Sequence, residues 1–244
     1  AGGAGAGQRA AQPLSAGRPG GRHSVREILI ADDHPLFREA LRGAVLRAVP
    51  EATPLEAASV GALLEALDAH PQCELLLLDL NMPGANGFSA LVHVRASHPA
   101  VPVVVVSARE DADTVRRALG HGAAGFIPKS ADLGTMCTAL ERILDGGTWA
   151  PADVVATPLA PDEARLAQAL AALTPAQFRV LGMVCAGLLN KQIAWELSIT
   201  EATVKAHMSA VLRKLGVHTR TQAVMLAGKL ALDPGAVRAP PESE

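Results

Sequence analysis

Five polar residues fall where apolar stretches of the chain end. Asp32 and Asp33 follow the first stretch, Asp79 closes a run of four leucines, and Ser107 closes a run of four valines. Lys129 follows a fifth apolar stretch. If the stretches are parallel strands, their carboxyl ends meet at one edge of a sheet. The sequence therefore predicts one pocket with three carboxylates, a hydroxyl and an amine.

These residue types indicate phosphoryl chemistry. Three crowded carboxylates repel one another unless a cation lies among them, and Mg²⁺ prefers such oxygen ligands while keeping several waters. The ion would also screen an incoming phosphate, while Lys129 and Ser107 would contact the phosphoryl oxygens. Phosphoryl transfer depends mainly on this positioning and charge neutralisation. We therefore expect a carboxylate that accepts a phosphoryl group beside Mg²⁺.

Each acid taken alone has a purely structural explanation. Asp33 or Asp79 could cap the helix that follows it, since Asp commonly caps helices. One such residue would favour that explanation. Five compatible types, each at its own strand end, favour a site.

The elements that must position these residues alternate along the first half of the chain. Five apolar runs and five amphipathic stretches predict a parallel sheet covered on both faces. The leucine and valine runs are apolar throughout, as in central parallel strands. The expected strands are 25–31, 53–58, 75–79, 101–107 and 123–127, and the expected helices are 35–48, 59–69, 87–97, 111–120 and 131–145.

The chain changes character after residue 150. Residues 152–172 are rich in Pro and Ala and are expected to form a linker, with a short helix from Asp162 onward. From residue 173 the pattern is wholly helical. Four helices are expected: one from the capping box Thr174–Gln177 to Gly187, one capped by Asn190, one from Thr200 to Leu215 with Gly216 behind it, and one over 220–230. Short helices with tight turns indicate a helix-turn-helix.

The third of these helices carries an apolar stripe and a polar face. Val204, Met208, Val211 and Leu215 recur at steps of four, three and four, so they are expected to face a core. Lys205 and Ser209 lie off the stripe near the helix start, where a recognition helix reads bases. An ordinary solvated face explains these two side chains equally well, so the pattern alone leaves both readings open.

Length and charge divide the chain in the same way. The 244 residues suit two domains better than one. Residues 25–151 hold 10 Lys and Arg against 16 Asp and Glu, whereas residues 173–230 hold 7 against 2. An acidic half joined to a basic half suggests that only the second meets a polyanion. A solvated basic surface is an equal alternative on charge alone.

Three further features restrict the setting. Cys73, Cys137 and Cys185 are far apart and lack a C-x-x-C pair, which favours free thiols in a reducing compartment. No apolar run is long enough to cross a bilayer. Residues 1–24 lack the apolar core of a secretory signal, and we expect them to form a disordered tail. A second tail is expected over 233–244.

The first half resembles the receiver domain of bacterial response regulators over about 120 residues. The resemblance rests on Ala31-Asp32-Asp33-His34-Pro35, Asp79-Leu80-Asn81-Met82-Pro83 with Gly87, Val106-Ser107-Ala108 and Gly125-Phe126-Ile127-Pro128-Lys129. The later Gly146-Gly147-Thr148-Trp149-Ala150-Pro151 is similar to the closing stretch of NarL/FixJ receivers. The resemblance implies a flavodoxin-like (βα)5 domain over 25–151.

It also implies residue roles. Asp79 would accept the phosphoryl group from a sensor histidine kinase. Asp33, Asp79 and the carbonyl of Asn81 would bind Mg²⁺, with Asp32 assisting. Ser107 and Phe126 would form a switch pair, in which the hydroxyl moves to the phosphate and the ring turns inward, while Lys129 would bind the phosphoryl oxygens. Pro128 is less usual before the lysine and could restrain its loop.

Residues 173–232 resemble the LuxR-type helix-turn-helix. The resemblance rests on Leu173-Thr174-Pro175, Asn190-Lys191-Gln192-Ile193-Ala194, Leu197-Ser198-Ile199-Thr200, Thr203-Val204-Lys205-Ala206-His207 and Lys214-Leu215-Gly216-Val217, with Val180-Leu181, Arg220 and Ala223-Val224. It implies a groove-facing set of Lys205, Ala206 and Ser209, phosphate contacts from Lys191, Thr203 and Arg220, and a dimer surface of Val217, Ala223 and Val224. The apolar side chains of this surface could equally belong to the core, and some of them are expected to. Gln177-Phe178 replaces a charged pair common in relatives, which we expect to alter only a surface contact.

Together these features predict a transcription regulator of a two-component system in the bacterial cytoplasm. Its expected partners are a sensor histidine kinase, double-stranded promoter DNA, a second copy when phosphorylated, and RNA polymerase. We expect the unphosphorylated receiver to cover the recognition helix and to release it on phosphorylation.

Two rival functions remain. An orphan regulator would keep the DNA-binding function without the switch and would be governed by a ligand, a partner or its abundance, but the complete pocket argues against it. A phosphatase or Mg²⁺-dependent hydrolase would use an Asp-x-Asp or a G-x-x-x-x-G-K-[ST] loop, and the chain has neither at the expected place. We therefore expect self-catalysed loss of the phosphoryl group but no turnover of an external substrate.

Overall fold

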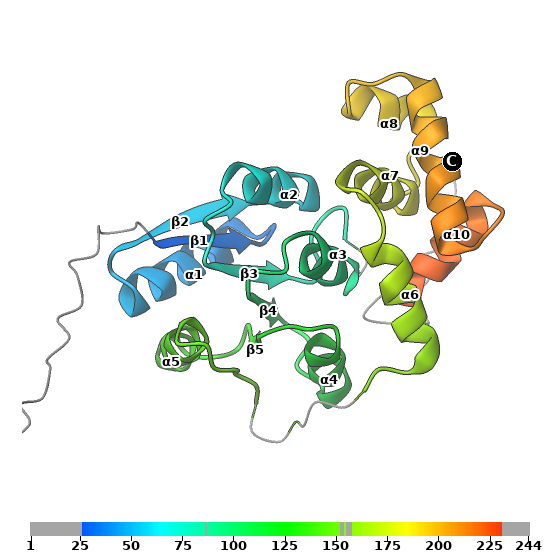
Figure 1. The fold of residues 1–244 in the computed structure, drawn as a ribbon. Coiled ribbons are helices and arrows are strands. Elements are labelled where there is room, and N and C mark those ends of the chain that lie inside the picture. Colours follow the sequence, from blue (N-terminus) through cyan, green and yellow to red (C-terminus); the bar gives the residue numbers. More distant parts are fainter. Residues whose placement is uncertain (1–25, 86, 152–153, 155–157, 231–244) are drawn as a thin grey trace, which may run out of the picture.

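The computed structural model describes residues 26–85, 87–151, 154 and 158–230. Its first part is a parallel sheet between two layers of helices, and its second part is a group of helices packed beside one layer (Figure 1). The tails expected over 1–24 and 233–244 lie outside the described residues. Among the described helices, none combines the length and apolar character needed to span a membrane.

The sheet has the strand order β2-β1-β3-β4-β5, and every neighbouring pair is parallel. β3 and β4 are fully buried, as their unbroken apolar sequences predict. The strands are β1 (Arg26–Ala31), β2 (Ala52–Ala57), β3 (Leu75–Asp79), β4 (Val103–Ser107) and β5 (Gly125–Pro128). The predicted strands are confirmed, with ends that differ by at most two residues.

Helices cover both faces of the sheet. α1 (Pro35–Ala48) and α5 (Leu133–Leu144) lie on one face, where their apolar residues pack on Ile28, Leu77 and Val104. α2 (Val60–Ala69), α3 (Ser89–Ser97) and α4 (Ala112–Gly120) lie on the other. Alternate residues of one strand enter opposite cores, so β3 sends Leu77 to the first and Leu76 to the second. This arrangement brings all five strand ends to one rim.

Five helices follow. They are α6 (Pro161–Ala171), α7 (Pro175–Cys185), α8 (Asn190–Glu196), α9 (Glu201–Leu215) and α10 (Arg220–Gly228). α6 occupies much of the stretch expected as a linker, beginning where the short helix was predicted, and its Leu166 and Leu170 are buried. The predicted caps of α7 and α9 are confirmed, including the capping box of Thr174 with Gln177.

One predicted cap is wrong. Asn190 is the first residue of α8 rather than its cap, and Leu189 precedes the helix. The Gln192 side chain accepts a hydrogen bond from the Leu189 backbone N–H at 2.7 Å. The Asn190 side chain instead accepts a hydrogen bond from Arg220 at 3.2 Å. Asn190 is therefore engaged in packing α10 rather than in starting α8.

The two parts share an apolar core. α6 packs on α3, and α7 packs on α2, so the core on this face of the sheet continues into the C-terminal helices (Figure 1). The His93 ring of α3 stacks on the Phe178 ring of α7 with centroids 4.2 Å apart. The C-terminal helices are thus held against the sheet domain rather than tethered beside it.

Candidate functional site

The rim of the sheet gathers the predicted acids around one amine. Lys129 Nζ lies 2.6 Å from Asp32 Oδ2 and 2.9 Å from Asp79 Oδ2, and both carboxylates are almost completely buried. Asp79 ends β3, Asp32 follows β1, and Lys129 follows β5, so three separate strands position these groups. A shallow cleft of about 580 Å³ opens beside them and is also lined by Asn81 and Ala108.

Lys129 is held in its charged form. Burial opposes the charge, but the hydrogen bonds that Nζ donates to the Asp32 and Asp79 carboxylates outweigh this and raise the pKa of Lys129. The Phe37 ring lies 4.6 Å from Nζ and adds a cation–π contact. The amine therefore offers a fixed positive charge at the floor of the cleft.

The carboxylates fit a divalent cation. One ligand atom from each of Asp32, Asp33, His34 and Asp79 lies within 4.8 Å of the others. Asp33 Oδ1 is buried and has no hydrogen-bond partner among the described residues, although His34 Nδ1 approaches to 2.8 Å outside hydrogen-bonding angles. A buried, unpartnered carboxylate oxygen is costly in a protein. Binding to Mg²⁺ would satisfy it, and the donor set suits that ion.

The sequence did not single out His34 as part of this cluster. Its ring follows the paired acids directly, and its backbone N–H donates to Asp32 Oδ1 at 2.7 Å. Only its position next to Asp33 could have indicated this. The ring is largely exposed, so it lies at the mouth of the site.

Asn81, Ser107 and Phe126 are the remaining residues predicted for the pocket. The Asn81 N–H donates to Asp79 Oδ1 at 3.2 Å, which keeps the loop after β3 close to the acid. Ser107 is buried, and its Oγ accepts a hydrogen bond from the Arg109 N–H at 3.1 Å. Phe126 is also buried. The inward position expected of its ring after switching is therefore already occupied in this structure.

The face of α9 predicted to read bases is exposed. Val204, Met208, Val211 and Leu215 are buried, which confirms the predicted stripe. The other predicted positions are exposed or half-buried: Lys205, Ala206 and Ser209 are exposed, and Thr203 is half-buried. The expectation that the sheet domain covers this face is wrong for this structure, because that domain packs on α6 and α7 instead.

The other predicted contacts of the helical part fall into two groups. Lys191 is exposed on α8, so its side chain is accessible for the predicted contact with a DNA phosphate. Arg220 is half-buried, and its guanidinium donates to Asn190 Oδ1 and to the Leu188 carbonyl. It therefore ties α10 to the start of α8.

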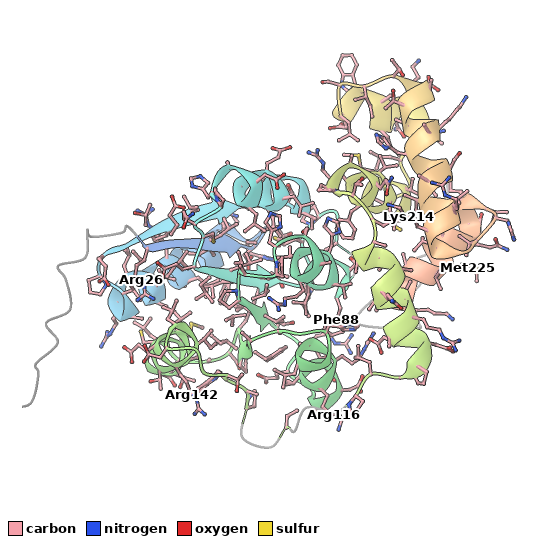
Figure 2. All side chains as sticks on the ribbon, viewed as in Figure 1. Arg26, Phe88, Arg116, Arg142, Lys214 and Met225 are labelled. Carbon is pink, nitrogen blue, oxygen red and sulfur yellow. The ribbon has the colours of Figure 1, made fainter. Side chains whose placement is uncertain are left out.

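The predicted dimer surface is only partly accessible. Ala223 has no exposed surface, so it belongs to the core of the helical part and is unavailable for a dimer contact in this structure. Val217 and Val224 are half-buried. On α10, Met225 is 62% exposed and projects outward (Figure 2). Small apolar residues fit either a core or an interface, which is why sequence alone did not separate them.

Phe178 overturns a further expectation. Instead of altering a surface contact, it is buried against His93 of the sheet domain. Burial lowers the pKa of His93 to about 4; a weaker interaction with the Leu170 carbonyl acts in the opposite direction without reaching hydrogen-bonding geometry. The sequence offered a signal here, namely an aromatic residue in a chain with only 2% aromatics.

Comparisons with known families match both parts of the chain. Residues 28–141 match the model described as response regulator receiver domain. Residues 171–227 match the model described as bacterial regulatory proteins, luxR family.

Two relatives extend over most of the chain. A glycerol metabolism activator from Pseudomonas putida is 43% identical over 211 residues, which cover 84% of this chain and 96% of that protein. The nitrate/nitrite response regulator protein NarL from Escherichia coli K12 is 34% identical, covering 81% and 93%. RcsB from Salmonella enterica serovar Typhimurium, solved bound to a promoter with a phosphomimetic, has a TM-score of 0.50 at 20% identity and covers 84% of this chain and 99% of RcsB. That likeness shows the shared fold.

Proposed function

Because the chain belongs to the bacterial response regulators, with a receiver domain followed by a LuxR-type DNA-binding domain, we propose that phosphorylation of Asp79 controls its binding to promoter DNA. One observation carries the proposal: Lys129 bonds both Asp32 and Asp79 at the rim of the sheet, beside the unpartnered oxygen of Asp33. This arrangement offers an acceptor carboxylate, a cation site and a positive charge within one cleft.

Asp79 is the acceptor in this proposal. Its carboxylate ends the central strand β3 and borders the cleft, whereas Asp32 is buried behind it and Asp33 remains available to a cation. An Asp79 oxygen attacks phosphorus while the bond between phosphorus and the donor breaks, and the donor leaves with that electron pair. The donor is a phosphohistidine of a sensor kinase. Lys129 moves from the carboxylate to a phosphoryl oxygen of the product.

Asp32, Asp33, Asp79 and the main-chain carbonyl of Asn81 would hold Mg²⁺. The single amine of Lys129 cannot neutralise three carboxylates. When bound, the ion supplies the additional positive charge. Asp79 ends β3 and the other ligands directly follow β1 or β3, which are adjacent strands, so the sheet fixes their spacing. Self-catalysed loss of the phosphoryl group is expected, without turnover of an external substrate.

Ser107 and Phe126 convert this charge into a change of shape. The phosphoryl group adds roughly two negative charges, and the Ser107 hydroxyl turns from the Arg109 N–H to donate to a phosphoryl oxygen. The loop before α4 loses that hydrogen bond and shifts. Because Phe126 is already buried, the shift repacks the ring within the core instead of drawing it in from solvent.

The C-terminal helices are the output. Lys205, Ala206 and Ser209 face the major groove, and Lys191 and Thr203 contact phosphates. Arg220 supports these contacts by fixing the start of α8, since its guanidinium is engaged there. Two phosphorylated copies bind adjacent half-sites, which raises affinity through effective concentration. Val217 and Val224, with Met225, form the contact between copies, and RNA polymerase is a further partner at the promoter.

The proposed boundaries are 25–151 for the receiver and 173–232 for the DNA-binding domain. The intervening residues 152–172 contribute α6, whose apolar face packs on the receiver.

The decisive experiment uses acetyl phosphate as donor in the presence of Mg²⁺. Intact mass should show one added phosphoryl group on the wild type and none on Asp79→Ala or Asp79→Asn. Gel-shift and light-scattering assays on the same samples should show tighter DNA binding and dimers only when Asp79 is phosphorylated. Phosphorylation that persists without Asp79, or DNA affinity indifferent to it, would refute the proposal.

A further inference from the structure

The acid pair at the rim of the sheet is held by an arginine of α1. Arg38 Nη1 donates to the main-chain carbonyl of Asp32 at 2.7 Å, and Arg38 Nε donates to Glu56 Oε2 of β2 at 3.1 Å. Only 17% of the Arg38 side chain is exposed. One guanidinium therefore joins the residue that follows β1 to the neighbouring strand β2.

The helix itself gives no local reason for this arginine. Arg38 lies one turn from the start of α1, where the helix dipole does not favour a cation. Arg42 lies four residues further on, so two like charges are neighbours on the helix surface. Glu56 lies between them, 3.1 Å from Arg38 and 3.9 Å from Arg42. The contacts of Arg38 outside α1 are therefore its structural reason.

The contact with the Asp32 carbonyl bears on the next residue, Asp33. The Asp32 N–H donates to the Ala57 carbonyl at 3.1 Å, so this side of the residue is fixed by β2. Arg38 fixes the other side. Because a peptide unit is planar, the position of the carbonyl oxygen sets the orientation of the unit that leads into Asp33. The direction of the Asp33 side chain therefore depends on Arg38.

The two acids differ in how they are held. The Asp32 carboxylate accepts hydrogen bonds from Lys129 and from the His34 N–H, whereas Asp33 Oδ1 is buried and has no hydrogen-bond partner among the described residues. A metal ligand depends on outer contacts that orient it, and losing such a contact typically lowers metal affinity by about 10- to 100-fold. For Asp33 this orientation comes through the backbone.

We propose that Arg38 is a positioning residue, which directs Asp33 toward the cation and thereby sets the Mg²⁺ affinity of the site. The inference rests on the proposed function, because it concerns the cation of that site. Arg38 acts through the Asp32 carbonyl and the peptide unit that follows it. Glu56 holds the other side of the guanidinium, so β2 takes part in shaping a site whose ligands come from β1 and β3.

Charge alone would give Arg38 the opposite effect. A guanidinium near a cation site repels the cation, so its removal would strengthen Mg²⁺ binding. Positioning predicts that its removal weakens binding. The direction of the change therefore distinguishes the two effects.

The test measures Mg²⁺ binding to the full chain by isothermal titration calorimetry, without a phosphoryl donor. Arg38→Met keeps an unbranched side chain but removes the charge and the hydrogen-bond donors. It should bind Mg²⁺ about 10-fold more weakly than the wild type, or more weakly still. Arg42→Met is the control, because Arg42 is exposed and lies near the same Glu56. It should bind Mg²⁺ at least as tightly as the wild type.

Arg38→Lys provides a conservative variant. Lysine restores the positive charge and a donor for the Asp32 carbonyl, but it lacks the fork that reaches this carbonyl and Glu56 together. It should bind Mg²⁺ more tightly than Arg38→Met and more weakly than the wild type. A pure charge effect would reverse the order of the two variants. Circular dichroism verifies that each variant remains folded.

Phosphorylation by acetyl phosphate separates affinity for the cation from the chemical step. Arg38→Met should need about 10-fold more Mg²⁺ for its half-maximal rate, but it should reach the wild-type rate when Mg²⁺ is saturating. A rate that stays low at every Mg²⁺ concentration would contradict a role in orienting a ligand of the cation.

The outcomes distinguish this inference from the proposed function. If the wild type binds Mg²⁺ and is phosphorylated on Asp79, but Arg38→Met binds Mg²⁺ as tightly as the wild type, the role of Arg38 is refuted and the proposed function stands. If the wild type does not bind Mg²⁺, both fail. Weaker binding by Arg38→Met, with partial recovery in Arg38→Lys and no loss in Arg42→Met, supports the role of Arg38.

Discussion

Lys129 is the side chain on which the charge balance of the pocket depends. It is the partner of two buried carboxylates, so removing its amine leaves them facing each other without compensation. We expect Lys129→Ala to lower the free energy of unfolding by roughly 3 kcal/mol, in the range for breaking a buried ion pair. Urea unfolding in the absence of Mg²⁺ measures this.

Lys191→Ala provides the control for that variant, because Lys191 is exposed and its removal should change stability by no more than about 0.5 kcal/mol. Addition of Mg²⁺ should recover part of the loss in Lys129→Ala by supplying another positive charge. Equal stability of the two variants would show that the carboxylates do not depend on Lys129.

Lys205 is exposed near the start of α9, where a base contact is expected. Lys205→Ala should weaken specific DNA binding by about 1–3 kcal/mol, and wild-type affinity should fall steeply with salt. Fluorescence anisotropy with a labelled promoter fragment measures both. Arg142→Ala on α5, distant from α9, should leave binding unchanged (Figure 2). Loss of affinity for all sequences alike would assign Lys205 to phosphate rather than to a base.

Among the helices, α9 shows most directly how a local signal sets an element. Thr200 caps its start, and Gly216 follows its end with φ +67°, a left-handed conformation that favours glycine. Gly216→Ala should therefore destabilise the DNA-binding domain by about 1 kcal/mol, because alanine disfavours this backbone conformation. No steric cost is added, since nothing near residue 216 would clash with the methyl group.

Urea unfolding tests this prediction, with Gly228→Ala as the reference because residue 228 also has open space but no left-handed backbone. If both variants lose the same stability, the conformation of Gly216 is not what ends the helix.

The elements were predictable because their signals are local. Unbroken apolar runs identified β3 and β4, and capping residues identified α7 and α9. The pocket was predictable for a related reason: parallel strands bring their ends together, so residues a hundred positions apart could be placed at one rim. The prediction that Asn190 caps α8 was wrong because a polar residue at a helix start can serve either as a cap or as a hydrogen-bond partner of another helix.

The arrangement of the two domains could not be predicted in this way. Phe178 looked like a surface residue because its partner His93 lies on a distant helix, and nothing in the local pattern of α7 names that partner. For Ala223 the sequence left an interface and a core position equally open, because a small apolar side chain carries no sign of its surroundings, and the structure places it in a core. The exposure of the recognition face of α9 was likewise not predictable, because it depends on the packing of α6 and α7 against the sheet domain.

The buried His93 makes this packing sensitive to acid. Its pKa is about 4 while it is buried, below the ordinary value near 6.5, so states in which the ring is exposed bind a proton first. Stability is therefore complete above about pH 6.5 and decreases as the pH falls toward 4. About 2 kcal/mol should be lost between pH 6.5 and pH 5. Of the nearby titratable groups, His98 lowers the pKa of the His93 ring and Asp68 raises it.

Urea unfolding at a series of pH values measures the loss. His93→Phe keeps an aromatic ring against Phe178 but cannot bind a proton, so its stability should decrease less over the same range. A variant that loses as much stability as the wild type would place the sensitivity at another group.

The open face of α9 has a kinetic consequence. Lys205 and its neighbours remain exposed while the domains are packed together, so non-specific attraction to DNA does not wait for a signal. If Asp79 is phosphorylated as proposed, a copy without the phosphoryl group would already bind DNA non-specifically and move along it. Phosphorylation would then change the residence time at the target site rather than the onset of DNA binding.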